Sequence, residues 1–225
     1  MNVDQILQSR SNRKTRLARP YANFFETFDQ CSKAGESILE NYDSIEFASL
    51  IERSIVISTV TAIEVYYRDM LDFIFKYCAP DFLEPKLKHL HQEKYDIADI
   101  LDIYRHKVHP LELISNSQSF QNIERIEKIF GKFLDKGFWS TVLNQQVRRV
   151  DEPENIVTWT NDDFLGLKST FSLRHELVHD PARKAFFNEE VFKNIWKSAH
   201  MIFGSDVVLS RILTENRDPS LDSDD

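Results

Sequence analysis

Glycine, proline and cysteine are scarce in this sequence, and long apolar runs are absent. Five glycines and seven prolines in 225 residues leave few positions for sharp turns, so we expect long helices with few connections. The two cysteines, Cys31 and Cys78, lack the spacing of metal ligands, and we expect both to be reduced residues within helices. No apolar run approaches the roughly 18 residues that span a bilayer, and residues 1–5 show no signal-peptide pattern. We therefore expect a cytoplasmic protein that makes no use of a membrane.

Positive charge is also in deficit, since the formal net charge is −8 at pH 7. This deficit argues against broad nucleic-acid affinity, which depends on neutralising phosphates. The obvious local source of positive charge is residues 1–20, a basic N-terminal arm that carries Arg10, Arg13, Lys14, Arg16 and Arg19 against the single acid Asp4. Residues 215–225 hold five acids and one arginine. They are predicted to form an acidic disordered tail, with which the arm could equally pair.

What the sequence does have is a helical pattern rich in large apolar residues, including 17 phenylalanines. Helices are predicted over 21–40, 44–78, 120–133, 138–147, 161–179 and 191–213, with a loop at 151–159 and irregular short pieces over 79–115. Thr160 and Asp163 fit a capping box, and Asn188 precedes two glutamates, so both sites predict helix starts. We therefore predict an all-α fold. It is an up-and-down helical bundle over residues 21–214, with 79–150 as a helical insertion or elaboration.

The segment 172–181, Ser-Leu-Arg-His-Glu-Leu-Val-His-Asp-Pro, fits two unrelated catalytic patterns. From His175 it reads H-E-x-x-H, the helix pattern in which two histidines bind zinc and the glutamate, here Glu176, activates water. From Arg174 it reads as an arginine, a polar neighbour, and a histidine, His179, five positions after the arginine. A third interpretation is structural: a surface helix end whose basic side chains interact with the C-terminal dipole.

The flanking residues favour the arginine–histidine pattern over the zinc pattern. Pro181 predicts that the helix stops at about His179, whereas a zinc-peptidase helix continues beyond its second histidine. A third zinc ligand is also hard to find, because residues 180–184 contain neither glycine nor histidine and His200 is the only later histidine. We therefore predict no metal and no cofactor. The zinc metallopeptidase remains an open alternative.

The arginine–histidine pattern resembles the R-x4-6-H motif of the HEPN family, small helical domains many of which are metal-independent ribonucleases. Residues 173–179 look like the motif helix of its RiboL-PSP-like groups, and residues 62–71 look like their second helix. The specific part of the resemblance is short, and Asp180-Pro181 stand where many relatives have a glycine. The resemblance implies an endoribonuclease that acts on RNA as a homodimer, with both motifs in one cleft. It also implies a toxin or anti-phage effector that an antitoxin or sensor protein holds silent.

The chemistry of RNA cleavage suits these residue types. Attack by the ribose 2′-OH on phosphorus needs a proton acceptor, a proton donor and a cation beside the phosphorane. His179 can exchange protons near neutral pH, Arg174 stays charged and forks hydrogen bonds to phosphate, and the resemblance assigns His175 an orienting role. On one helix Arg174 and His179 lie about 140° apart. One motif therefore looks incomplete by itself, which agrees with a dimer.

Weaker candidates lie elsewhere in the chain. Glu64 is the only charge in the span 54–67, and it is either an auxiliary site residue or the ion-pair partner of Arg68. The apolar residues of 120–133 offer a face for dimerisation or for a partner protein, so a non-catalytic helical interaction module is a second alternative. Two histidine pairs are expected at the surface because no cluster of acids or cysteines completes a metal site: His89 with His91, and His106 with His109.

Overall fold

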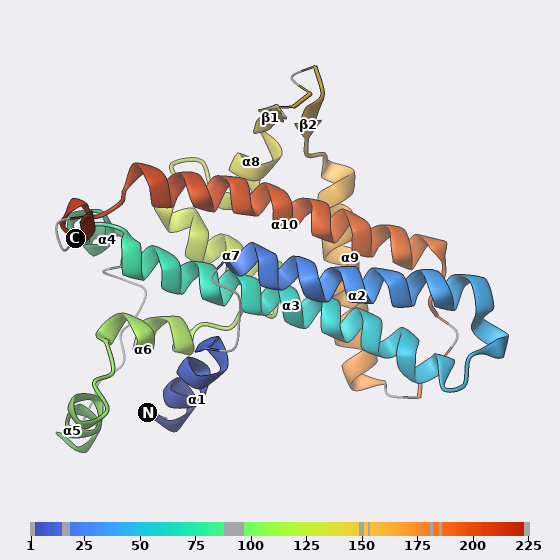
Figure 1. Ribbon diagram of the computed structural model, residues 1–225, viewed down its shortest axis with the longest axis horizontal. Helices are drawn as coiled ribbons and strands as arrows, with labels where there is room; N and C mark the ends of the chain where they lie inside the picture. Colours follow the sequence, from blue (N-terminus) through green and yellow to red (C-terminus); the bar gives the residue numbers. More distant parts are fainter. Residues whose placement is uncertain are drawn as a thin grey trace.

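The computed structural model describes residues 3–14, 19–87, 97–148, 151–152, 154–180, 182–184 and 186–222. These residues form a mostly helical bundle with one small two-stranded hairpin (Figure 1). The prediction of a helical bundle is confirmed, and the hairpin is the exception to all-α character. Within the described residues, no helix combines the length and the apolar content needed to cross a membrane.

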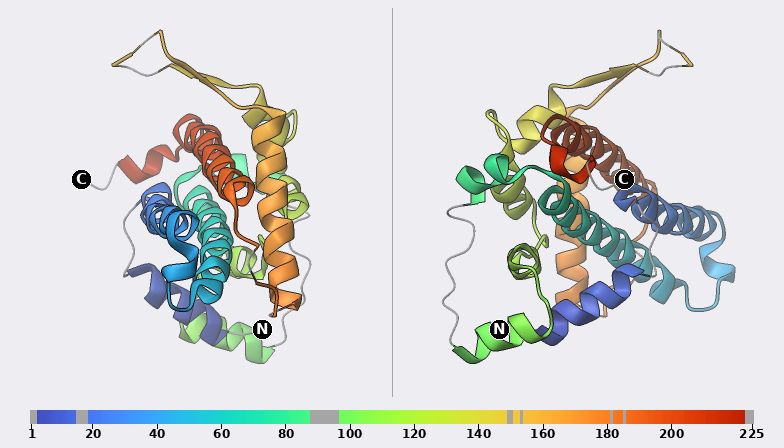
Figure 2. Two further views of the ribbon diagram at one scale, coloured as in Figure 1. Left: turned by 90° about the vertical axis from the view of Figure 1, so that its right-hand side faces the viewer. Right: turned by 60° about the vertical axis from the view of Figure 1, so that its left-hand side comes forward.

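Four long helices make up most of the bundle: α2 (Pro20–Asn41), α3 (Ala48–Tyr77), α9 (Asn161–His179) and α10 (Glu189–Glu215). In Figure 1, α2, α3 and α10 lie along the long axis of the molecule, and α3 and α10 run in the opposite direction to α2. Helix α9 packs on α10 and α3 and crosses them obliquely (Figure 2). All four helices match their predicted ranges to within a few residues.

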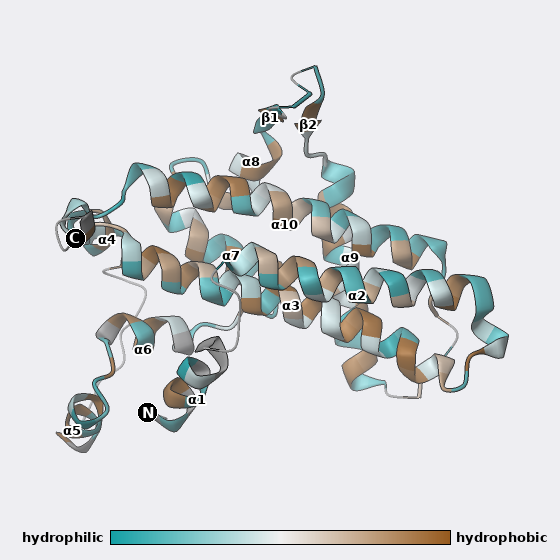
Figure 3. Ribbon diagram, viewed as in Figure 1, coloured by the Kyte–Doolittle hydropathy of each residue, from teal (hydrophilic) through white to brown (hydrophobic). Residues whose placement is uncertain are grey.

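Helix α3 is the centre of the bundle, as its nearly uncharged sequence predicts. It packs against α2, α9 and α10, and apolar residues recur along it (Figure 3). Its start at Ala48 is later than predicted because Phe47 adopts a left-handed conformation with φ of 62°. The apolar side chains of α3 that are fully excluded from solvent are Val56, Val60, Ile63, Tyr67, Leu71 and Ile74.

The helix-start signals are confirmed. The Thr160 hydroxyl accepts a hydrogen bond from the Asp163 amide at 3.2 Å, and the Asp163 carboxylate accepts one from the Thr160 amide at 2.8 Å. Asn188 accepts a hydrogen bond from the Val191 amide at 3.0 Å. These caps set where α9 and α10 begin, and therefore the register of α9, whose other end carries the motif.

The insertion consists of short helices, as expected, but two of its boundaries differ from the prediction. Its helices are α4 (Pro80–Leu87), α5 (Ile97–Arg105), α6 (Pro110–Ser117), α7 (Ile123–Phe130) and α8 (Phe138–Leu143). The helix predicted over 120–133 is only α7, followed by a 3₁₀ turn at Gly131–Phe133. The helix predicted over 138–147 ends at Leu143. Strand β1 (Gln146–Arg148), which begins within that predicted helix, pairs antiparallel with β2 (Ile156–Thr158), which lies where a loop was predicted.

The apolar face of residues 120–133 is buried inside the chain rather than offered to a partner. Phe120 and Phe130 are fully buried, and their rings contact Tyr67 of α3, while Phe130 also contacts Phe138 of α8. The prediction of an interface on this face is therefore wrong, because neighbouring helices of the same chain already cover it. Large apolar side chains are exposed on α5 instead: Ile97, Ile100, Leu101 and Tyr104.

The first and the last described segments of the chain both pack against other elements. Helix α1 (Val3–Lys14) contacts α6, and Arg10 forms an ion pair there with Glu112. At the other end, α10 includes Glu215, the Asp218 amide donates to the Tyr77 carbonyl at 2.8 Å, and a 3₁₀ turn follows at Pro219–Asp222. The structure therefore differs from the predicted disordered tail over residues 215–222. Residues 223–225 lie outside the described part of the chain.

Candidate functional site

The motif lies on the last turns of α9. The helix ends at His179, and the Asp180 amide closes its last turn by donating to the Glu176 carbonyl at 2.8 Å. The Asp180 carboxylate then accepts a hydrogen bond from the Ala182 amide at 3.1 Å, which forms a turn directly after the helix. The prediction that the motif sits at a helix-to-loop junction is therefore confirmed.

Arg174 points toward the neighbouring helix α3, where it meets Glu64. Its Nη2 lies 3.7 Å from Oε1 of Glu64, and the two side chains are only 21% and 11% exposed. Within the described part of the chain, neither Nε of Arg174 nor Oε1 of Glu64 has a hydrogen-bond partner. The structure thus brings the auxiliary candidate Glu64 to the motif arginine through an ion pair that leaves part of the hydrogen-bonding capacity of both groups unused.

Burial has the largest influence on the pKa of Glu64. Burial raises the pKa of this carboxyl above its ordinary value, while the positive charges of Arg174 and, to a smaller extent, Arg68 lower it. Arg68, the partner suggested by helix spacing, is therefore the weaker of the two charges. The carboxyl that faces Arg174 takes up a proton more readily than an exposed glutamate.

His175 and His179 face away from Arg174. Both residues are exposed, and their rings lie one turn apart with centroids at 4.5 Å and planes at 63°. No hydrogen bond in the described part of the chain joins either histidine to Arg174. The sequence expectation that Arg174 and His179 do not share one face is confirmed: the arginine points to the core and the histidines point to solvent.

Side chains of α3 hold the end of α9 in a way that the sequence did not reveal. The guanidinium of Arg53 donates to the Leu177 carbonyl at 3.4 Å and to the Arg183 carbonyl at 3.1 Å. The neighbouring Glu52, fully buried, accepts a hydrogen bond from the Phe187 amide at 3.2 Å. Arg53 therefore binds carbonyls on both sides of the turn, a task that a glycine-containing cap performs at many helix ends.

The side chains near the motif do not assemble a metal site. Among the described residues, no three histidine, cysteine, aspartate or glutamate side chains gather in a way that could hold a metal ion. Glu176, the base of the zinc pattern, is in an ion pair with Arg183. His200 belongs to α10 and lies beside the first turn of α9, at the opposite end from the motif. Its Nδ1 is 3.3 Å from Oδ1 of Asp163. His175 and His179 therefore have no third ligand in this part of the chain.

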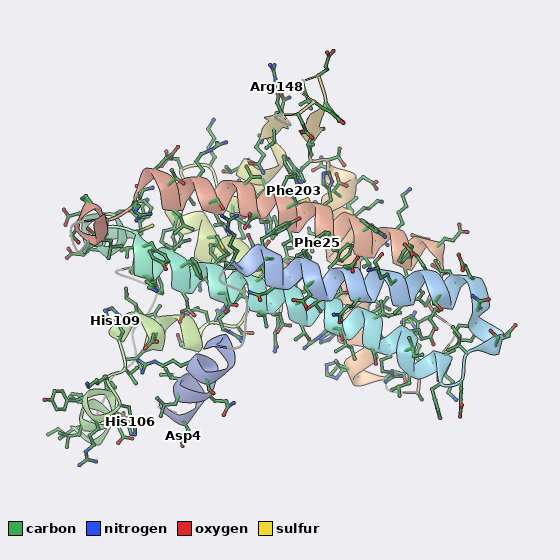
Figure 4. All side chains as sticks on the ribbon, in the orientation of Figure 1. Asp4, Phe25, His106, His109, Arg148 and Phe203 are labelled. Atoms are coloured by element: carbon green, nitrogen blue, oxygen red, sulfur yellow. The ribbon has the colours of Figure 1, made fainter. Side chains whose placement is uncertain are left out.

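The other histidines that the structure describes are remote from the motif. His106 and His109 lie at the junction of α5 and α6, away from α9 (Figure 4). Both are exposed, as predicted, and His109 caps α6 by accepting a hydrogen bond from the Leu111 amide at 3.2 Å. His89 and His91 lie outside the described residues.

A pocket of about 300 Å³ opens beside the motif, between α9 and α10. Glu176 lines it together with residues of both helices and of the segment that joins them. No sequence pattern indicated this pocket, because its walls come from positions that are far apart in the chain.

Comparisons with protein families, with curated proteins and with solved structures find no match to this chain.

Proposed function

We propose that this protein is a metal-independent endoribonuclease of the HEPN type. The observation that carries the proposal is the geometry at the end of α9: an arginine paired with a buried carboxylate, and two exposed histidines, one directly after the arginine and one a turn later. A cation and imidazole side chains, here carried on different sides of one helix end, are the groups that cleavage of RNA requires.

The residues take distinct roles in this mechanism. The ribose 2′-oxygen attacks phosphorus while its proton passes to the neutral imidazole of His179. The bond from phosphorus to the 5′-oxygen breaks, and that oxygen takes a proton from the imidazolium of His179. The products are a 2′,3′-cyclic phosphate and a 5′-hydroxyl. Arg174 stabilises the charge on the phosphorane, and His175 orients the phosphate. Water then opens the cyclic product to a 3′-phosphate.

A second copy of the chain completes the site in this proposal. Arg174 and His179 point to different sides of α9, so one helix does not bring both to the same phosphate from one direction. Val178 stands between them in the sequence and is 50% exposed, an apolar side chain that a second copy could cover. We propose a homodimer in which the two motifs face one cleft. From the resemblance, we further propose a toxin or anti-phage role under the control of an antitoxin or sensor protein.

The test of the chemistry uses purified protein and single-stranded RNA in excess EDTA. Cleavage is expected to persist and to leave cyclic phosphate or 3′-phosphate ends. Arg174→Ala and His179→Ala should each lower the rate by at least about 100-fold while the far-ultraviolet circular dichroism stays unchanged. His106→Ala, an exposed histidine remote from the motif, is the matched control and should cleave at the normal rate.

Two outcomes would reject this function. Loss of cleavage in EDTA with recovery on zinc, together with stoichiometric zinc that depends on His175 and His179, would establish the metallopeptidase-like site instead. Absence of cleavage under all conditions, in a folded protein, would favour the interaction module.

The composite site has a separate test. Chains carrying Arg174→Ala and chains carrying His179→Ala are co-expressed with different tags, and the mixed dimer is isolated. If each site takes arginine from one copy and histidine from the other, the mixed dimer keeps one intact site of two and should recover half of the normal rate. A mixed dimer as inactive as either parent would show that each site lies within one chain. A monomer in light scattering at micromolar concentration would reject the dimer.

A further inference from the structure

The pocket beside the motif has the walls of a small-molecule site rather than of a packing defect. Its apolar side is formed by Val56 of α3, by Leu173 of α9, and by Val191 and Ile195 of α10. Val56 and Ile195 are buried. The opposite side carries hydroxyl, amide and charged groups. A volume of about 300 Å³ with mixed walls of this kind suits a ligand of the size of a nucleoside.

The charges of the pocket favour a neutral occupant over an anion. Two carboxylates and one guanidinium line it: Glu176, Glu190 and Arg183. Arg183 is in an ion pair with Glu176, so these two charges compensate each other. Glu190 remains, and no described side chain is bonded to it. Glu190 is an exposed carboxylate in the first turn of α10, and a carboxylate without a side-chain partner disfavours phosphate and favours a neutral ligand that donates hydrogen bonds.

The heterocyclic bases of RNA differ in how well they satisfy a carboxylate. Guanine presents two adjacent donors on its Watson–Crick edge, the N1 imino group and the N2 amino group, which can both bond to one carboxylate. Adenine and cytosine each present one donor beside an acceptor on that edge, and uracil presents one donor between two acceptors. An acceptor-only side chain such as Glu190 therefore selects guanine.

The position of the pocket relates it to the proposed cleavage site. Glu176 forms part of the pocket wall and also lies between His175 and His179 in the sequence. His179 follows Glu176 by three residues and so lies nearly one helical turn farther along α9. A base held in the pocket would therefore present its phosphate to the histidine pair.

From these contacts, we infer that the pocket binds the guanine base of an RNA nucleotide next to the cleaved phosphate. This inference rests on the proposed ribonuclease function for its substrate, but the binding of the base itself can be measured without any cleavage.

The first experiment is a calorimetric titration of the wild-type protein with guanosine, adenosine, cytidine and uridine. These nucleosides contain no phosphodiester and cannot be cleaved. Guanosine should bind at least tenfold more tightly than the other three. Glu190→Gln should weaken guanosine binding at least tenfold, and Ser172→Leu, which fills the pocket with a larger side chain, should remove it. The matched control is Glu189→Gln, the preceding exposed glutamate that does not line the pocket, and it should bind guanosine normally.

The second experiment measures cleavage of four oligodeoxynucleotides that each contain one ribonucleotide, G, A, C or U. Cleavage after the guanosine should be at least tenfold faster than after the others, and Glu190→Gln should remove this preference.

The outcomes separate the pocket from the nuclease. Guanosine binding that depends on Glu190, in a protein that cleaves no RNA, would support the pocket and reject the ribonuclease. Cleavage without base preference, in a protein that binds no nucleoside, would reject the pocket and keep the ribonuclease. Preference for another nucleoside, or an equal effect of Glu189→Gln and Glu190→Gln, would overturn the guanine assignment. If circular dichroism shows that Ser172→Leu does not fold, the comparison of Glu190→Gln with Glu189→Gln tests the guanine assignment.

Discussion

Glu64→Gln removes the charge opposite Arg174 while it keeps the size and shape of the side chain, and its effect can be worked out from the structure. At 3.7 Å and an effective dielectric constant of about 20, the attraction between the two charges is about 4.5 kcal/mol. This attraction is opposed by the loss of hydration of the carboxylate. Burial is the largest influence on the pKa of Glu64, and the result is a pKa above the ordinary 4.5.

The raised pKa of Glu64 determines whether the free energy of unfolding rises or falls with pH. Because the folded-state pKa of Glu64 is raised, the folded protein binds more protons than the unfolded chain at pH values between 4.5 and the folded-state pKa. The free energy of unfolding therefore falls as the pH rises through that window. Above the window, the full cost of burying the ionised Glu64 carboxylate lowers the free energy of unfolding. Glutamine imitates the protonated acid and avoids the penalty. Above the window, we expect Glu64→Gln to unfold with a free energy equal to the wild type or higher by on the order of 1 kcal/mol.

The assay is urea unfolding at pH 5 and pH 8, followed by tryptophan fluorescence. The decrease in unfolding free energy between the two pH values should be smaller in Glu64→Gln than in the wild type. It should not vanish, because burial also raises the pKa of Asp206 and gives a contribution of the same sign. Glu36→Gln, an exposed glutamate on α2, is the control and should keep the wild-type pH dependence. RNA cleavage by Glu64→Gln should fall roughly 10- to 100-fold, because Arg174 loses the charge that orients it.

A loss of more than about 2 kcal/mol at pH 8 in Glu64→Gln would refute this reasoning, because it would show that the ion pair stabilises the fold more than burial destabilises it. Unchanged cleavage in a stable Glu64→Gln protein would instead refute the positioning role of Glu64.

Three further changes test the supports of the site. Arg53→Ala should lower the unfolding free energy by about 1–3 kcal/mol, because two backbone carbonyls at the end of α9 lose their donor. Amide hydrogen exchange over residues 177–187 should accelerate, and the exposed Arg211→Ala should change neither quantity. Gly204→Ala should cost about 1–3 kcal/mol despite the better helix propensity of alanine, because the new methyl group would lie 2.7 Å from the Trp159 ring; a gain in thermal stability would contradict the close packing there. Thr160→Ala should cost about 1 kcal/mol through loss of the capping box that starts α9, measured by urea unfolding, and no loss would show that the cap contributes nothing.

The long helices could be predicted because their signals are local. Helix-forming composition indicated α2, a nearly uncharged span indicated α3, and the capping residues Thr160 and Asn188 located the starts of α9 and α10. Pro181 predicted the end of α9 at His179, since proline restricts the residue before it. The hairpin lacks such a local signal, because strands of three residues, such as Gln146–Arg148, are too short to show a periodic pattern.

The contacts that build the site could not be predicted because they are long-range. Helix spacing pointed Glu64 toward Arg68 on the same helix, whereas the fold brings it to Arg174, which is distant in the sequence. In the same way, the apolar spacing of residues 120–133 is identical for a face that meets another chain and for one that meets α3. Only the arrangement of helices decides between these partners.

The charges of α3 show how such a site could be recognised in other chains. Arg53 and Glu64 lie on a helix that is buried on several sides, and each contacts a different part of α9 or of the segment after it. A charged side chain in a buried helix needs a partner, so two such charges on one helix indicate that another helix carries polar groups facing both. In this chain that other helix is α9 with its motif. The central helix therefore does more than fill the core: by binding the backbone at Leu177 and the side chain of Arg174, it sets both the position of the helix end and the direction of the arginine. A change in the register of α3 would displace both together, which ties the geometry proposed for catalysis to the most buried element of the fold.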